Sequence, residues 1–198
     1  MDFQIIGGNK GAEITLDKII MGDVLEVSID FSLPEEAIPE KFTLRWYFSA
    51  KDCAFTWNPS MMDIHGLYFD WGKKIIKSRL ASWMPIQQII SRDGNNKLNI
   101  AVSDVDTPIE IGTGIREEDA TIECDVSFFT LPTSPTTHYS AILRLDMRDI
   151  PYYDSIYDVT DWWENECGYK SAFIPEGAKE PVDSLWYSFH QKLDKEKI

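Results

Sequence analysis

The chain has 198 residues, of which 43% are hydrophobic and 13% aromatic, so it is long enough to bury one substantial core and is not a disordered segment. Its 33 acidic and 19 basic residues give a formal net charge of −14. This balance argues against nucleic acid and against anionic membrane as partners, because both favour clustered Lys and Arg.

The N-terminal residues and the cysteines bear on the cellular compartment. The start, Met-Asp-Phe-Gln-Ile-Ile, lacks the basic residues and long apolar stretch of a secretory signal, and no run approaches a membrane span. Cys53, Cys124 and Cys167 form no CxxC pair, so neither a zinc site nor a disulfide framework is predicted. Reduced thiols are typical of the cytoplasm, and we expect the protein in this compartment. If a signal peptide has been removed from the sequence, the expected location is the periplasm or the outside of the cell.

Period-two alternation of apolar and polar residues predicts half-buried strands along the chain. The alternation is clear at 24–31, 121–128 and 143–148 and weaker at 13–19 and 42–48. Many short strands with one apolar face predict an all-β fold, a large sandwich of two antiparallel sheets (supersandwich-like) rather than a closed barrel.

The segments between these strands also have recognisable patterns. Residues 92–96, Arg-Asp-Gly-Asn-Asn, predict a hairpin turn between strands at 83–90 and 98–102, because Gly and Asn tolerate positive φ. Residues 52–72 are aromatic and aperiodic, which predicts an elaborate loop, and 154–168 predict a turn and a short helix. We therefore expect a sandwich domain over 1–165 and a linker over 166–183.

No pattern in the chain predicts catalytic or metal chemistry. The three histidines have no HxH or HExxH spacing, and there is no Gly-x-Ser-x-Gly motif. Residues 7–11, Gly-Gly-Asn-Lys-Gly, lack the spacing of a phosphate-binding loop and predict a turn between strands. Carboxylates are numerous, but no pair of them is singled out as an acid–base couple. We therefore expect that this chain contains no catalytic residue and binds no metal and no cofactor.

The seven tryptophans allow two interpretations. Aromatic rings in irregular segments stack on the C–H faces of sugars, whereas Trp also fills large sheet cores. The tryptophans in irregular segments are Trp57, Trp71, Trp162, Trp163 and Trp186.

The C-terminal residues carry a resemblance to a known family. Residues 181–191, Pro-Val-Asp-Ser-Leu-Trp-Tyr-Ser-Phe-His-Gln, resemble the entry into the catalytic barrel of α-galactosidases of the melibiase and raffinose-synthase type, glycoside hydrolase family 36. Residues 157–163 and the loop at 56–59 are similar to other parts of that family. An apolar stretch at 185–189 followed by a charged stretch at 192–198 also fits a βα unit, so 184–198 is expected to be the first strand and helix start of a (β/α)₈ barrel.

This resemblance implies that the chain is the non-catalytic N-terminal domain of a retaining α-galactosidase-like enzyme, which supports the barrel and shapes the rim of the sugar pocket. The two catalytic carboxylates are then expected beyond Ile198, on later barrel strands. By the same resemblance Trp186 and Tyr187 line the galactose pocket, together with a Trp of the N-terminal domain, for which Trp57 is the first candidate and Trp71 the second. The implied partners are an α-galactoside or another carbohydrate and the barrel domain itself.

Two alternatives remain at this point. The chain could be a stand-alone β-sandwich that binds carbohydrate or another protein, or a purely structural domain whose aromatic residues are all core. Without barrel neighbours, the apolar side chains of the tail also predict association between copies of the chain, a homo-oligomer.

Overall fold

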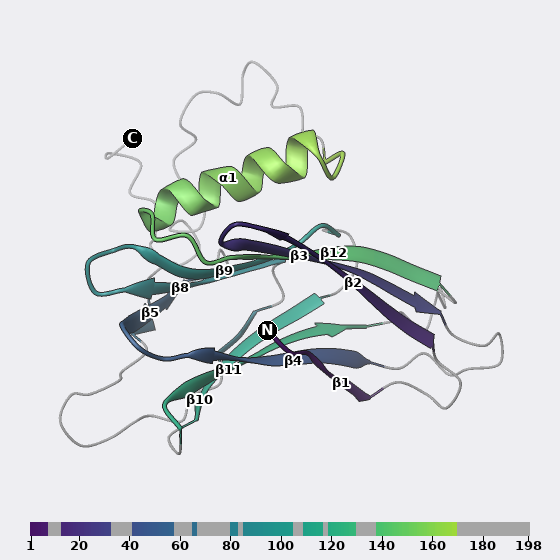
Figure 1. Ribbon diagram of the computed structural model, residues 1–198, viewed down its shortest axis with the longest axis horizontal. Coiled ribbons are helices and arrows are strands. Elements are labelled where there is room, and N and C mark those ends of the chain that lie inside the picture. Colours follow the sequence, from purple (N-terminus) through teal and green to yellow (C-terminus); the bar gives the residue numbers. More distant parts are fainter. Residues whose placement is uncertain are drawn as a thin grey trace, which may run out of the picture.

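The computed structural model describes residues 1–7, 13–32, 41–57, 65–66, 80–82, 85–104, 109–116, 119–129 and 138–169. In these ranges two antiparallel sheets pack face to face, and a helix lies on the outer face of one of them (Figure 1). The predicted all-β architecture of two packed sheets is therefore confirmed.

The two sheets have different sizes. The smaller sheet has the strand order β1 (Gln4–Gly7), β4 (Phe42–Ser49), β11 (Thr121–Phe128), β10 (Ile109–Arg116) and β7 (Leu80–Ser82). The larger sheet has the order β2 (Glu13–Met21), β3 (Val24–Ser32), β12 (His138–Asp146), β9 (Asn96–Val102), β8 (Ile86–Ser91), β5 (Cys53–Trp57) and β6 (His65–Gly66). Every neighbouring pair is antiparallel.

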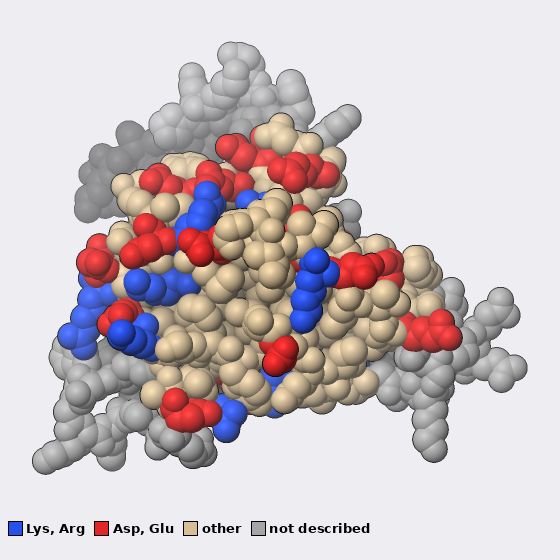
Figure 2. Space-filling model, in the orientation of Figure 1, with Lys and Arg blue, Asp and Glu red and all other residues tan. Residues whose placement is uncertain are grey.

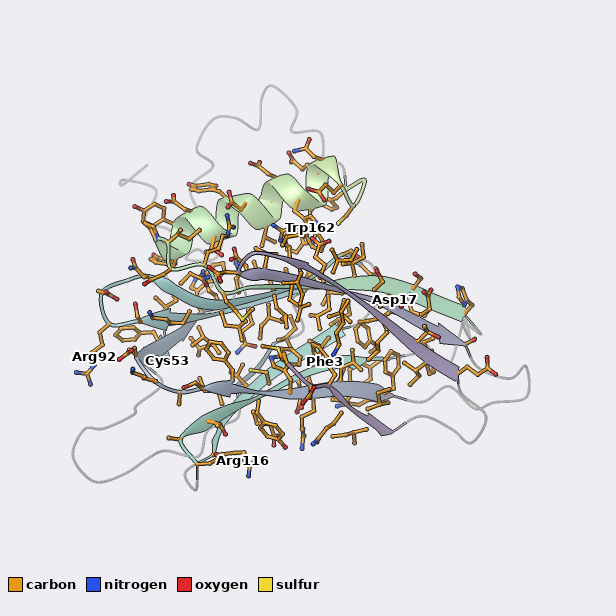
Figure 3. The ribbon with its side chains drawn as sticks, viewed as in Figure 1. Phe3, Asp17, Cys53, Arg92, Arg116 and Trp162 are labelled. Carbon is orange, nitrogen blue, oxygen red and sulfur yellow. The ribbon has the colours of Figure 1, made fainter. Side chains whose placement is uncertain are left out.

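The core lies between the sheets and follows from the alternation along each strand. In β3 and β11 the apolar residues are buried at every second position, and they face the same core cluster. Three stacked rings join the two sheets: Phe42 lies 4.4 Å from Phe31 and 4.8 Å from Phe128, measured between ring centroids. Phe3, which precedes the edge strand β1, lies between the two layers (Figure 3). Its ring packs on that of Trp46, which is fully buried.

Most of the described strands coincide with the sequence patterns, but β1, β5, β6, β7 and β10 were not predicted. The structure has a strand at each of the five segments that showed alternation, although β12 ends at Asp146 and leaves the last two residues of its segment outside the strand. The prediction of an elaborate loop over 52–72 was wrong where β5 occupies Cys53–Trp57 and pairs with β8, and where β6 occupies His65–Gly66 and pairs with β5. A register shift between Cys53 and Phe55 breaks the period-two pattern there. Strand β10 was not predicted, since Gly112 and Gly114 weaken its strand propensity.

The predicted hairpin turn is confirmed between β8 and β9. Strand β8 ends at Ser91, and β9 begins at Asn96. Gly94 has a φ of +86°, a conformation that favours glycine, so its position in the turn has a direct steric reason.

Helix α1 (Tyr152–Asn165) follows the last strand and covers the outer face of the larger sheet (Figure 1). The predicted segment, 154–168, is shifted toward the C-terminus by two residues at its start and three at its end. Ser155, Val159 and Trp162 are the buried residues of α1, and their spacing places them on one face. Acidic side chains gather over α1 in Figure 2, and the helix has no basic residue.

The described residues end at 169. Most of the predicted linker and the whole of the predicted barrel strand and helix start, 184–198, therefore lie outside the described residues. Nothing in the helical structure that is described has both the length and the apolar character needed to cross a membrane.

Candidate functional site

Trp57 is the predicted sugar-contacting residue that the structure describes. It is the last residue of β5 and is half-buried. It packs against a small cluster of buried residues between α1 and the larger sheet, formed by Ile86, Ala101, Val159 and Trp162. Trp186, Tyr187 and the second candidate, Trp71, lie outside the described residues, so the predicted three-residue site stays a prediction.

Two aromatic residues of α1 contribute to the packing beside Trp57: Trp162 belongs to the cluster, and Trp163 packs against it. Trp162 is buried between the helix and the sheet (Figure 3) and lies under the guanidinium of Arg144, 5.4 Å from its ring centroid. Trp163 is half-buried, and its Nε1 donates a hydrogen bond of 2.8 Å to the carbonyl oxygen of Val102. Trp57 thus borders a packed helix–sheet contact, and part of its surface serves packing.

A row of side chains crosses the outer face of the larger sheet beneath the start of α1. Trp57, Gln88, Asn99 and Asp146 are opposite one another on β5, β8, β9 and β12. The last three are buried, with at most 1% of their surface exposed. Buried polar groups need hydrogen-bond partners, and here the partners come from the helix and from the residues just before it.

Asp146 is the charged centre of this row. Its carboxylate accepts bonds of 2.9 and 2.6 Å from the Arg148 guanidinium and 3.1 Å from the Ser155 hydroxyl. Burial by itself would raise the pKa of Asp146, but these bonds and one from the Arg148 backbone N–H outweigh it and hold the pKa below its usual value. Arg148 also contacts Asp158 of α1 at 2.6 Å. The network ties the helix to the sheet.

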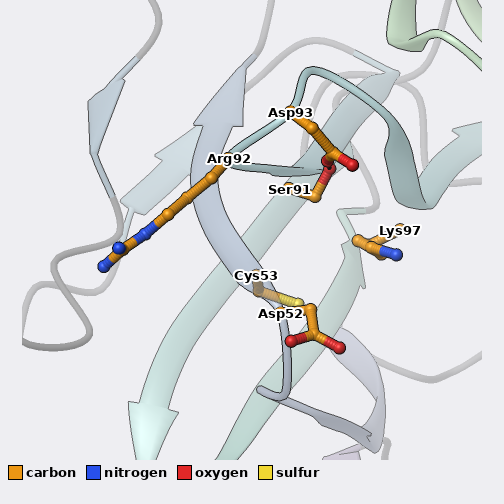
Figure 4. Close-up of a pocket in the computed structure, with 6 residues that line it drawn as sticks. All are labelled: Asp52, Cys53, Ser91, Arg92, Asp93 and Lys97. Carbon is orange, nitrogen blue, oxygen red and sulfur yellow. Dashed lines mark hydrogen bonds between the residues drawn. The ribbon is translucent and has the colours of Figure 1, made fainter.

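A cleft of about 610 Å³ lies elsewhere, where the turn before β5 meets the β8–β9 hairpin (Figure 4). Its lining residues are Asp52, Cys53, Ser91, Arg92, Asp93 and Lys97. In Figure 4 the Arg92 side chain extends away from the other five. The cleft therefore offers polar and apolar surface in about equal measure, and its lining carries both signs of charge.

The electrostatics of the cleft favour an ionised carboxylate at Asp93 and a neutral thiol at Cys53. The Ser91 hydroxyl donates to Asp93 and lowers the pKa of that carboxyl. Burial raises the pKa of the Cys53 thiol to about 11, and its Sγ donates to the Ser49 carbonyl oxygen at 3.5 Å. At neutral pH the thiol is protonated, so Cys53 is no activated nucleophile. The cleft can bind a polar ligand through hydrogen bonds, and its thiol is suited to packing.

Thiol labelling tests this description of Cys53. At pH 7.5 we expect iodoacetamide to modify Cys53 at least tenfold more slowly than a free cysteine, whose pKa is about 8.5. The rate should rise about tenfold for each pH unit between 7 and 9, because the thiolate fraction grows in that proportion below a pKa of about 11. Mass spectrometry of the native protein measures the modified fraction at each cysteine.

Cys124 and Cys167 serve as internal controls for this labelling. Cys124 is fully buried and should react last, whereas Cys167 is half-buried and should react first. In strong urea all three should react alike. Labelling of native Cys53 at the rate of a free cysteine would contradict the assignment and would make the cleft a nucleophilic site.

Neither the cleft nor the buried polar row was predicted from the sequence. The hairpin half of the cleft was visible as the 92–96 turn, but Asp52 and Cys53 join it only through the pairing of β5 with β8. Gln88 and Asn99 had no signal, because an amide within a strand is typical of an exposed face. Within the described ranges no group of three or more His, Cys, Asp or Glu side chains is placed to hold a metal ion.

Comparison with protein-family models gives no match for this chain, and comparison with curated proteins gives none either.

Proposed function

We propose that this chain is the N-terminal, non-catalytic domain of a retaining α-galactosidase-like glycoside hydrolase, where it supports the catalytic barrel and shapes the rim of the sugar pocket. The observation that carries the proposal is the order of elements along the chain. A large two-sheet sandwich is followed by a helix packed on one sheet and then by residues 181–191, whose sequence resembles the family 36 barrel entry.

The attachment of α1 supports a scaffolding role. The helix contains the 157–163 segment that resembles the family's route from sandwich to barrel. Val159 and Trp162 bury one face of it, and Trp163 adds a hydrogen bond to β9. The chain therefore leaves the sandwich from a fixed position, which suits a domain that holds a neighbouring domain in place.

The described tryptophans give less support to a stand-alone sugar-binding module. Trp46 and Trp162 are buried, and Trp57 and Trp163 are half-buried against the helix–sheet contact. Stacking on a sugar needs an exposed ring face, and these four rings are at least partly occupied by packing. One feature favours the module, namely the cleft lined by Asp52 and Asp93, whose carboxylates offer hydrogen-bond partners for hydroxyl groups.

An activity assay tests the proposal. The chain of 198 residues should not hydrolyse an aryl α-galactoside above the rate in buffer, because the proposed catalytic carboxylates belong to the barrel. The product of the gene read beyond Ile198 should hydrolyse it. Release of the aryl alcohol, followed by absorbance, measures both. Turnover by the 198-residue chain at an ordinary enzymatic rate, or a longer gene product that encodes no barrel, would refute the proposal.

Titration calorimetry with galactose and with α-galactosides tests the stand-alone module. Measurable affinity that Trp57→Ala abolishes would favour the module over the scaffold. Trp163→Phe is the matched control, because Trp163 belongs to the same cluster and is also half-buried. Loss of affinity in both variants would indicate damage to the cluster instead of loss of a sugar contact.

A further inference from the structure

Gln88 and Asn99 form a buried pair of amides beneath helix α1. They are directly opposite each other on the neighbouring strands β8 and β9, and their side chains share the outer face of the sheet. Gln88 has 0% and Asn99 1% of its surface exposed. Each amide donates hydrogen bonds to α1, so the helix closes over the pair.

The orientation of the Gln88 amide is determined by its neighbours. The Nδ2 of Asn96 donates bonds of 3.0 Å to the carbonyl oxygens of Asp146 and Arg148, so the Oδ1 of Asn96 must be an acceptor. The Nε2 of Gln88 donates to that Oδ1 and to the Tyr152 carbonyl oxygen, at 3.0 Å each. A flipped Gln88 would place oxygen against two acceptors. Its Oε1 therefore points away from these partners.

The orientation of the Asn99 amide is determined in the same way. The Ser155 hydroxyl donates its proton to Asp146 Oδ2 at 3.1 Å, so Ser155 Oγ is an acceptor for its other neighbours. The Nδ2 of Asn99 donates to this Oγ at 2.9 Å and to the Ser155 carbonyl oxygen at 3.2 Å. Both amide protons are thus used, and the Oδ1 of Asn99 is left as an acceptor.

Gln88 Oε1 and Asn99 Oδ1 are consequently two buried acceptors for which the described residues supply no donor. A buried acceptor without a partner is unfavourable, so two of them on facing residues would be a substantial penalty. We propose that one internal water molecule binds between these two oxygens and donates one hydrogen bond to each. Residues directly opposite in a sheet have Cβ atoms about 5 Å apart, which a single water can bridge.

Water fits this site better than a cation does. A calcium ion takes about six to eight oxygen ligands, often carboxylates. The buried carboxylate of the row, Asp146, is already engaged by Arg148 and Ser155. The two remaining acceptors are neutral amide oxygens, and they require two donors, which one water provides. The water completes the polar attachment of α1 to the sheet.

A high-resolution crystal structure of the protein is the direct test. We expect a well-ordered water about 2.7–3.2 Å from both Gln88 Oε1 and Asn99 Oδ1, with no access to bulk solvent. A cation peak with shorter contacts, a protein donor in that position, or two oxygens separated with no density between them would each overturn the proposal. This test needs no substitution, so it does not depend on a variant that folds.

Water–protein NMR on the same chain supplies a second readout. The side-chain amide protons of Gln88 should give a cross-relaxation peak with water whose sign indicates a long residence time. Asn99→Leu should remove this peak, because the water loses one acceptor. Gln87→Met should retain it, since Gln87 is equally buried but donates to Thr56 and Thr113 on the opposite face of β8. A peak that survives Asn99→Leu, or is missing in the wild type, contradicts the bridge.

Discussion

Phe42→Ala is expected to lower the free energy of unfolding by about 3–5 kcal/mol. Phe42 is 1% exposed and stacks on Phe31 of the larger sheet and on Phe128 of its own sheet. Its removal leaves a cavity between the sheets and breaks both ring contacts, neither of which the rigid strands can restore by moving together. Urea unfolding followed by far-ultraviolet circular dichroism measures the change.

Phe42→Leu is the matched control for the stack. Leucine fills most of the space but cannot stack, so we expect a loss of about 1–2 kcal/mol. If Phe42→Leu loses much less free energy of unfolding than Phe42→Ala, the filled volume makes the larger contribution to stability. If the two variants lose similar amounts, ring stacking makes the larger contribution. If Phe42→Ala cost less than about 1 kcal/mol, the sheets could not be packed as described.

Asp146→Ala is expected to lower the free energy of unfolding by about 3 kcal/mol, because breaking a buried ion pair costs about 3–5 kcal/mol when the remaining charge is left unpaired. The side chain of Arg148 is 34% exposed and retains Asp158, which places the expected loss at the lower end of that range. The substitution also removes the acceptor for Ser155, so α1 loses part of its attachment to the sheet. Urea unfolding measures this loss as well.

Asp158→Asn is the control, because Asp158 contacts the same guanidinium at the same 2.6 Å. Its side chain is 42% exposed, and exposed ion pairs contribute about 0–1 kcal/mol. Burial is therefore the main difference between the two carboxylates. Equal losses from Asp146→Ala and Asp158→Asn would show that Asp146 is not buried by the helix.

The contribution of Asp146 should depend on pH in a definite direction. Its pKa in the folded protein is below the usual 3.8, so the unfolded chain takes up the proton first as the pH falls. The stabilisation by ionised Asp146 is fully present above about pH 5. It is lost as the pH falls through the pKa of Asp146 in the unfolded chain and then through its lower pKa in the folded protein. The difference in stability between the wild type and Asp146→Asn should accordingly narrow below about pH 4.

The proposed function and the stability of α1 are linked through the same contacts. If the helix fixes the point at which the chain leaves the sandwich, loosening it should disturb a neighbouring domain without unfolding the sandwich core. The network around Asp146 and the cluster around Trp162 are the two attachments that such a role requires. They lie on the outer face of the sheet, separate from the core between the sheets.

Local patterns were enough to predict the strands with strong alternation, the hairpin turn and the presence of a helix after the last strand. Residues 24–31 and 121–128 each show which side chains face inward, because side chains alternate across a strand. Gly94 marks the turn through its own steric freedom. These properties belong to consecutive residues, and they need no knowledge of neighbours in space.

Tertiary contacts were needed to establish which strands are neighbours and what lies between them. Alternation assigns a face to a residue but not a partner, since sheet pairing joins residues far apart in sequence. Strand β5 was therefore predicted as loop. The half-buried position of Trp57 beside α1 likewise depends on contacts between residues far apart in the sequence. Gln88 and Asn99 became a facing pair through the β8–β9 register, and the residue that binds Asn99 from α1 lies 56 positions later in the chain. Non-local packing, which no short pattern encodes, produced these features.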